Sequence, residues 1–168
     1  MSDELTVRIA IVSDTHMPGG NRRLPDSCVE QLRIADLIVH AGDFVELSVL
    51  RELESYGAVV GVHGNVDDAE VRAVLPDRAM VESDGARIGI VHDAGPSRGR
   101  IRRLRGRFPS ADAVVFGHSH IPLHERMHDG FQIFNPGSPT ERRFAALHTM
   151  GIAEVQAGQV AFELVTLG

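Results

Sequence analysis

The sequence contains no lysine, and all 17 of its basic residues are arginine. The absence of lysine excludes a Schiff-base lysine, a lysine-dependent phosphate loop and a lysine general base. The only cysteine, Cys28, cannot form a disulfide within the chain, and we expect it to be a small buried apolar residue in a reducing compartment. Aromatic residues make up only 5% of the chain, which leaves no obvious platform for stacking nucleobases.

Long apolar runs are also absent, since no segment approaches the roughly 20 residues that a helix needs to cross a bilayer. The acidic start of the chain lacks the basic and apolar regions of a secretory signal, so we expect a cytoplasmic protein without a membrane partner. The net charge of −6 argues against broad nucleic-acid binding. With 43% hydrophobic residues, the chain is predicted to form a single globular domain over residues 1–168.

The first half of the chain alternates short Val/Ile-rich runs with helical patterns, as βαβ units do. Strands are predicted at residues 6–13, 37–41 and 58–63, and helices at 25–35, 47–56 and 69–74. Val29, Leu32 and Ile34 are expected to form the apolar face of the first helix.

The second half is rich in hairpin patterns. Strands are predicted at residues 79–82, 87–91, 113–116, 123–127, 131–134, 150–156 and 159–166, with one helix at 97–108. The two halves together predict an α/β fold in which two mixed sheets pack face to face, with helices outside.

Metal-binding residue types stand where five of the predicted strands end. They are Asp14 and His16, Asp43, Asn65, His92, and finally His118 and His120. The carboxyl ends of parallel strands meet at one rim of an α/β fold, so we expect these side chains to lie close together. Glycine directly precedes three of these residues, where it permits tight turns and close approach of the backbone.

The seven side chains comprise four imidazoles, two carboxylates and one carboxamide. Nitrogen and oxygen donors without thiolate suit manganese, the metal we expect, or iron, cobalt, nickel or zinc. Seven donors are too many for one ion with open positions, but they suit two ions about 3.5–4 Å apart that share a carboxylate. For any one of these residues an ordinary loop position is the better interpretation, but it does not account for all seven in this order.

Five motifs carry a resemblance to a known family. They are Asp14-x-His16, Gly42-Asp43, Gly64-Asn65-x-Asp67, His92 and Gly117-His118-x-His120. In this order they resemble the motifs of the calcineurin-like metallophosphoesterases. The later run Asn135-Pro136-Gly137-Ser138 resembles the small bacterial and archaeal phosphodiesterase branch of that superfamily. The resemblance covers about residues 6–145.

The resemblance implies a four-layer α/β/β/α sandwich with a centre of two divalent metal ions. It assigns Asp14, His16 and His120 to one metal, Asn65, His92 and His118 to the other, and Asp43 to both as the bridge. It implies a phosphodiesterase in which a metal-bridging hydroxide attacks phosphorus in line, acting on a small phosphate ester. Asn65, Asp67 and His118 are the expected catalytic residues. Asn65 would also offer its NH₂ to a phosphate oxygen, and Asp67 would orient a neighbouring ligand.

Two positions depart from the pattern of the family. Val66 stands where many larger members have a histidine that is proposed as the general acid. The loss of this histidine argues against efficient hydrolysis of monoesters more than against hydrolysis of diesters with good leaving groups. Asp93 stands where glycine is common, and it is either a solvated carboxylate or a partner of a metal ligand. His124 is an alternative acid.

Other polar residues have structural as well as functional interpretations. Six arginines within residues 98–107 would spread around a helix, which favours a solvated face, or a subunit contact in a homo-oligomer, over nucleic-acid binding. Arg142 and Arg143 would either clamp a phosphate or form surface salt bridges. His40 and His63 are expected to pack within the fold or to support the metal ligands.

Two rival functions remain open. A non-catalytic scaffold for protein assembly is one, because the small subunit of retromer resembles this fold. That interpretation expects metal ligands to be lost, whereas all seven are present. The other rival is a nucleotide phosphatase or cyclic-nucleotide phosphodiesterase, which the low aromatic content does not support.

Overall fold

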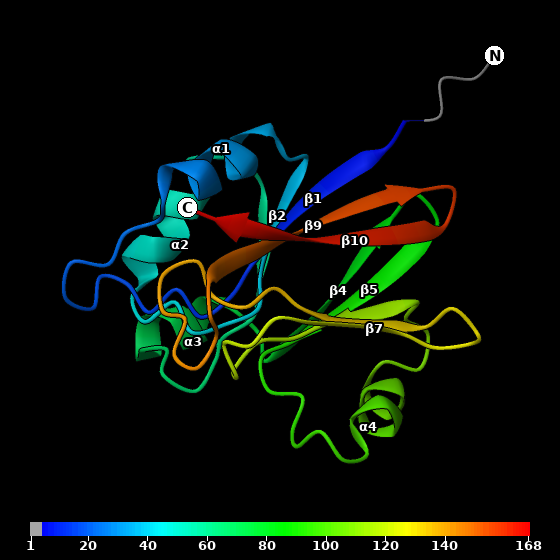
Figure 1. The fold of residues 1–168 in the computed structure, drawn as a ribbon. Coiled ribbons are helices and arrows are strands. Elements are labelled where there is room, and N and C mark those ends of the chain that lie inside the picture. Colours follow the sequence, from blue (N-terminus) through cyan, green and yellow to red (C-terminus); the bar gives the residue numbers. More distant parts are fainter. Residues whose placement is uncertain (1–4) are drawn as a thin grey trace.

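The computed structural model describes residues 5–168 as two five-stranded sheets packed face to face, with helices on their outer sides (Figure 1). The first sheet has the strand order β10-β9-β1-β2-β3. Its strands are β1 (Val7–Val12), β2 (Leu37–His40), β3 (Val59–Gly61), β9 (His148–Gln156) and β10 (Gln159–Leu167). Because β1, β2 and β3 run parallel, their carboxyl ends lie along the same edge.

The second sheet has the strand order β4-β5-β6-β8-β7. Its strands are β4 (Arg78–Ser83), β5 (Ala86–Val91), β6 (Ala113–Val115), β7 (Leu123–Arg126) and β8 (Gln132–Asn135). Within it, β5, β6 and β8 are parallel, whereas β4 and β7 pair antiparallel at the two edges. Each sheet is therefore mixed, as the sequence predicts.

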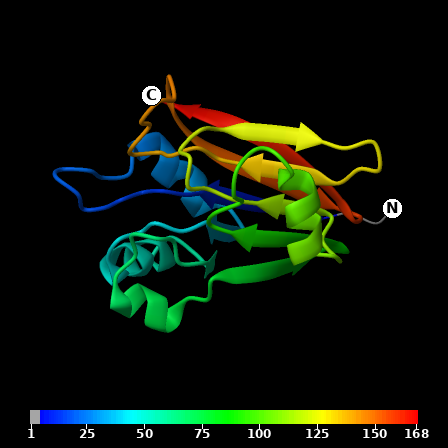
Figure 2. The ribbon, with the colours of Figure 1, turned by 90° about the horizontal axis from the view of Figure 1, so that it is seen from below.

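Four helices form the outer layers. They are α1 (Asp26–Ile34), α2 (Leu47–Glu54), α3 (Ala69–Val74) and α4 (Arg100–Arg107). The first three pack on the first sheet, and α4 packs on the second (Figures 1 and 2). None of the helices in residues 5–168 is long and apolar enough to span a membrane.

Three apolar clusters separate these four layers. In β1, Ala10 and Val12 face the cluster beneath the helices, whereas Ile9 and Ile11 face the cluster between the sheets. Successive side chains of a strand point to opposite faces, so a strand that is buried on both sides reads as a continuous apolar run. A third cluster, which includes Leu104, lies between the second sheet and α4. The four-layer α/β/β/α sandwich is confirmed.

Two expectations about the helices are wrong in detail. In α1 the buried side chains are Cys28 and Leu32, while Ile34 is 63% exposed because it ends the helix. Helix α4 begins three residues later than expected, at Arg100, because Gly99 has a left-handed φ of 72°. Cys28 is buried, as expected, and burial raises the pKa of its thiol to about 12.

The arginines of the 98–107 segment bond within the chain more than the sequence suggests. Arg105 pairs with Asp129 at 2.7 Å and lies over the ring of Phe131. Arg103 and Arg107 donate to backbone carbonyls of residues 93–98. These contacts fasten α4 to its own sheet and to the loop before it, which neither a solvated face nor a subunit contact would require.

Candidate metal centre

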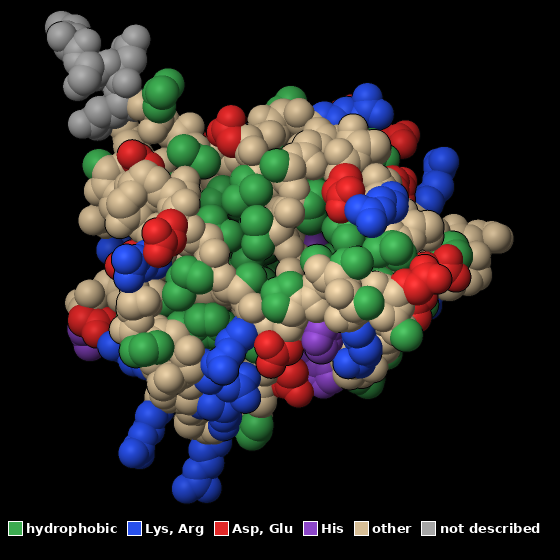
Figure 3. Space-filling model, turned by 180° about the vertical axis from the view of Figure 1, so that it is seen from behind, with side chains coloured by type: hydrophobic (Ala, Val, Ile, Leu, Met, Phe, Trp, Pro, Cys, Tyr) green, Lys and Arg blue, Asp and Glu red, His purple; other side chains and the backbone are tan. Residues whose placement is uncertain are grey.

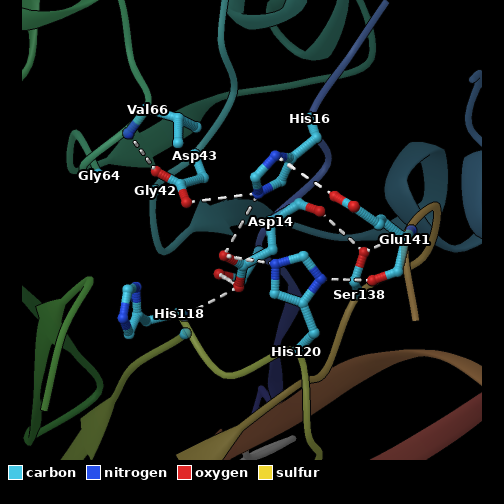
Figure 4. Close-up of polar contacts among 12 residues, drawn as sticks. Asp14, His16, Gly42, Asp43, Gly64, Val66, His118, His120, Ser138 and Glu141 are labelled. Atoms are coloured by element: carbon cyan, nitrogen blue, oxygen red, sulfur yellow. Dashed lines mark hydrogen bonds and ion pairs between the residues drawn. The ribbon is translucent and has the colours of Figure 1, made fainter. Parts of the chain in front are cut away.

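The loops after β1, β2, β3, β5 and β6 converge at one edge of the sandwich, and they bring together all seven predicted metal-binding side chains. Two groups form there. The first contains Asp14, His16 and His120, and the second contains Asp43, His92 and His118, with Asn65 beside it. Figure 4 shows Asp14 and His16 from one loop turned toward Asp43 and His120 from two others.

All three residues of the first group are buried. Asp14 Oδ1 lies 3.4 Å from His120 Nε2 and 3.9 Å from His16 Nε2. None of these three atoms makes a hydrogen bond to any of residues 5–168, although each is buried. Buried polar atoms without partners are costly, and a divalent cation is the partner that one carboxylate and two imidazoles would share. These residues therefore fit a metal ion.

The second group is more open, because His118 and Asn65 are exposed while His92 is buried. Asn65 Oδ1 lies 3.0 Å from His92 Nε2 and 3.2 Å from His118 Nδ1. The two imidazole nitrogens are 3.3 Å apart. An amide oxygen and two ring nitrogens thus face the same small volume, which suits a second cation that solvent can reach.

Asp43 lies between the two groups. Its Oδ2 atom is 3.3 Å from His16 Nε2 in the first group and 3.2 Å from His92 Nε2 in the second. Its Oδ1 atom accepts the backbone N–H of Val66 at 3.0 Å. One carboxylate oxygen is thereby fixed by the backbone, and the other is available to both groups.

The two oxygens of the Asp14 carboxylate also have different partners. Its Oδ2 atom accepts the hydroxyl of Ser13 at 2.7 Å and the backbone N–H of His118 at 3.0 Å. Its Oδ1 atom is the one that faces His16 and His120. The protein holds each carboxylate by one oxygen and leaves the other for a cation.

The backbone at these positions is strained. Five of the seven residues have a left-handed φ between 45° and 73°: Asp14, His16, Asp43, His118 and His120. For residues other than glycine such conformations each cost of order 1–3 kcal/mol, and they cluster at functional sites. Here the bonds from Asp14 N to Gly42 O (2.9 Å) and from His16 N to Asp43 O (3.1 Å) help to hold them.

Further contacts orient the imidazoles. His92 Nδ1 donates to the carbonyl of Ala41 at 2.7 Å, which leaves Nε2 as the lone-pair nitrogen toward Asp43. His120 Nδ1 donates to the carbonyl of Glu141, and the Glu141 carboxylate lies 3.3 Å from His16 Nδ1 (Figure 4). Glu141 thus contacts both imidazoles of the first group.

Sequence reasoning missed Glu141. Its loop follows the Asn135-Pro136-Gly137-Ser138 run, where Ser138 Oγ donates to Asp14 O and accepts the N–H of Glu141, both at 2.8 Å. The resemblance of that run to the phosphodiesterase branch was the available signal.

Asp67 lies beneath the centre, where it shapes the backbone. Its carboxylate accepts the N–H groups of Asp43 (3.0 Å), Val45 (2.7 Å) and Gly64 (2.6 Å). It therefore supports Asp43 through the main chain and does not orient a ligand side chain directly.

His40 is fully buried and packs within the fold, as expected. Its Nδ1 atom accepts the N–H of Gly42 at 3.0 Å, so Nε2 carries the proton and donates to Thr15 Oγ1 at 3.0 Å. Burial lowers the pKa of His40 to about 3, and its neutral ring stacks on Phe44. His40 links the Asp14–His16 loop to the Asp43 loop without carrying charge.

The charge states of the acidic and histidine side chains in the site favour binding of a cation. Burial opposes charge on the ring of His16, yet the carboxylates of Asp14 and Asp43 outweigh it and raise the pKa of His16 to about 9. Burial likewise opposes the charge on Asp43, but the imidazoles of His16 and His92 beside it and the backbone N–H of Val66 lower the pKa of that carboxyl. Two carboxylates that hold their negative charge in a buried site attract a proton in this way, and they attract a divalent cation for the same reason.

Several other predicted residues lie apart from the seven. Asp93 is exposed and accepts the N–H of Gly95, in agreement with a solvated loop carboxylate. His124 bonds to Gln132 and packs against Phe134 and Phe162, so the structure does not bring it to the centre.

The remaining predicted residues bond to the chain itself. The side chain of Arg142 donates to Ala146 O, and Arg143 lies 3.8 Å from Glu141. The ring of His63 lies 3.5 Å from Arg72. Val66 is 39% exposed beside the centre and contributes only its backbone N–H, to Asp43.

Comparison with known proteins identifies the family. The sequence model of the calcineurin-like phosphoesterase superfamily domain matches residues 7–158. A probable metallophosphoesterase of Methanothermobacter thermautotrophicus is 31% identical over 162 residues, which cover 95% of this chain and 92% of the relative. A phosphodiesterase of Methanocaldococcus jannaschii is 28% identical over 143 residues, covering 78% of this chain and 83% of the relative.

The fold has a close counterpart among solved structures. Vacuolar protein sorting 29 from Cryptosporidium parvum superposes with a TM-score of 0.78, covering 97% of this chain and 100% of the other, at 19% identity. The matched segment contains the five strand ends that form the two ligand groups. The chain belongs to the calcineurin-like phosphoesterase superfamily.

Proposed function

We propose that the chain is a two-metal phosphodiesterase. In this proposal one ion is held by Asp14, His16 and His120, and the other is held by Asn65, His92 and His118. Asp43 contacts both ions. The observation that carries this proposal is the position of Asp43 Oδ2, within 3.3 Å of an imidazole from each group. The relative named as a phosphodiesterase supports the same substrate class. Manganese is the proposed metal, since the donors are nitrogen and oxygen only.

Two bound cations would supply positive charge that lowers the pKa of a water and neutralises the phosphate oxygens. The protein contributes fixed geometry, because each carboxylate is anchored by one oxygen before substrate arrives. Asn65 directs its Oδ1 toward His92 and His118, which leaves its NH₂ to donate to a phosphate oxygen. Substrate approaches from this exposed second group, because the first group is buried.

Because Val66 cannot donate a proton, this position limits which substrates the site hydrolyses well. An isopropyl group cannot protonate a departing alkoxide, so the reaction favours esters whose leaving group departs as a stable anion. We therefore propose diesters with good leaving groups as better substrates than alkyl monoesters.

Hydrolysis of bis-p-nitrophenyl phosphate tests the proposal. We expect activity with added Mn²⁺, loss of activity with a chelator, and recovery when Mn²⁺ is restored. Activity that survives chelation, or none with manganese, iron, cobalt, nickel or zinc, would contradict it. A centre that also stays empty at micromolar Mn²⁺ would favour a non-catalytic scaffold on this fold.

Glu141→Ala is expected to weaken binding of one of two Mn²⁺ ions by about 10–100-fold, the usual effect of removing a group that supports a metal ligand. The reason is that the variant removes the carboxylate beside His16 Nδ1 and leaves the second group untouched. Calorimetric titration with Mn²⁺ measures both affinities. Glu30→Ala is the control, since Glu30 is exposed and has no side-chain bond to the described residues. Unchanged affinity for both ions would show that Glu141 does not support the centre.

A further inference from the structure

A cleft of about 520 Å³ opens beside the second ligand group. On one side it is lined by Asn65 and His92, which belong to that group. On the other it is lined by Arg78 at the start of β4 and Arg107 at the end of α4. In the lower half of the face in Figure 3, arginine, acidic and histidine side chains lie next to one another. A substrate held at the metal centre would have this cleft as its neighbour.

Two of the arginines in the cleft have fixed positions. Arg72 donates to the carbonyls of Gly64 (2.9 Å) and Asn65 (3.1 Å), so it braces the loop that carries Asn65. Arg107 donates one N–H to the carbonyl of Asp93 at 2.8 Å. A guanidinium has five N–H groups, so Arg107 keeps donors for a ligand.

Arg78 is different, because its side chain makes no hydrogen bond or ion pair with any of residues 5–168. It is exposed at the cleft, and its first position in the edge strand β4 fixes its backbone. An arginine without an intramolecular partner beside a candidate active site is available to bind an anion.

The other residues that line the cleft indicate which kind of anion it would bind. Two carboxylates, Asp77 and Asp93, also line the cleft, but the three arginines outnumber them and Asp93 already accepts the N–H of Gly95. Val91 is the one apolar side chain among the described lining residues, and the only rings there are the imidazoles of His63 and His92. The cleft therefore offers guanidinium donors, which suit an anion.

We infer that this cleft binds a second phosphate group, carried on one arm of the substrate, with Arg78 as its main contact. This inference rests on the proposed function, because it places the reacting phosphate at the two ligand groups. Guanidinium groups recognise phosphate oxygens through paired charge-assisted hydrogen bonds, which a neutral arm cannot form. The substrate is then a phosphodiester that bears a further phosphate, and Arg78 determines specificity without touching the reacting phosphorus.

Binding of two nucleotides that differ by one phosphate tests the inference without turnover. Calorimetry of the full chain with Mn²⁺ would compare thymidine 3′,5′-bisphosphate with thymidine 5′-monophosphate. We expect the bisphosphate to bind at least about tenfold more tightly, the scale of a charge-assisted hydrogen bond. In Arg78→Gln that ratio should fall close to one, and in Arg78→Lys it should be partly kept.

Arg126→Gln is the matched control. Arg126 is also exposed and unbonded among the described residues, but it lies on β7, the opposite edge strand of the same sheet. The control should keep the wild-type ratio. Equal affinity for the two nucleotides in the wild type, or a ratio that Arg78→Gln leaves unchanged, would overturn the inference.

A parallel assay separates this inference from the proposed function. The p-nitrophenyl esters of the 5′-phosphates of the same two nucleotides would be offered as substrates. If neither is hydrolysed, the proposed function fails, while the calorimetric ratio still decides whether the cleft binds a second phosphate. If both are hydrolysed with equal kcat/KM and bound equally, the function stands and the cleft assignment fails.

Discussion

Asp43→Asn is expected to lower kcat on bis-p-nitrophenyl phosphate by roughly a thousandfold or more, and to weaken binding of both Mn²⁺ ions. The carboxylate has one oxygen within 3.3 Å of His16 and of His92, so its loss removes negative charge from both groups at once. Metal centres stabilise transition-state charge by several kcal/mol, and about 1.36 kcal/mol corresponds to a tenfold change in rate. Asparagine keeps the shape and the bond to Val66 N, so folding should be preserved.

The measurement combines steady-state kinetics with calorimetric titration of Mn²⁺. Asp26→Asn serves as the control, because Asp26 is an exposed carboxylate in the first turn of α1 and contacts no ligand group. Loss of only one ion in Asp43→Asn would assign this carboxylate to a single group. Wild-type turnover would rule out its bridging role.

Gly64→Ala is expected to cost at least about a hundredfold in activity although it adds only one methyl group. A Cβ at Gly64 would collide with Asp43 Oδ1 and lie 2.6 Å from the backbone nitrogen of Asp43. Asp43 would have to move, and a misplacement of about 1 Å at a catalytic group can cost about 10²-fold. The backbone of Gly64 is not left-handed, so the effect comes from contact and not from the conformation of alanine.

Gly106→Ala makes the same substitution where a Cβ would meet nothing within 4 Å. Because Gly106 lies in α4, alanine should stabilise the protein by roughly 0.5–1 kcal/mol and leave activity unchanged. Kinetics, Mn²⁺ titration and thermal unfolding of the two variants would be compared. If Gly64→Ala retained full activity, the tight packing of its loop against Asp43 would have no functional role.

The strand-end residues could be predicted because they depend on a general property of parallel sheets. Asp14, Asp43 and Asn65 each follow a parallel strand of the first sheet, so their convergence required only the correct strands. The layer order was predictable for a similar reason, since runs that are apolar on both faces indicate strands buried on both sides.

Glu141 could not be predicted in this way. Its loop has no helix or strand period, and its position depends on contacts such as the one between Ser138 and Asp14, which are 124 residues apart in sequence. His124 shows the opposite error, because closeness in sequence to His120 suggested a role that the direction of β7 does not allow. The different partners of the two oxygens in each carboxylate could not be predicted either, since residue types do not say which oxygen is already bonded.

Anomalous diffraction from crystals grown with Mn²⁺ tests the central proposal most directly. We predict two manganese peaks per chain, one beside Asp14, His16 and His120 and the other beside Asn65, His92 and His118. The Asp43 carboxylate should contact both ions. A single peak, two peaks without Asp43 between them, or no peak at millimolar Mn²⁺ would contradict a two-metal centre in this chain.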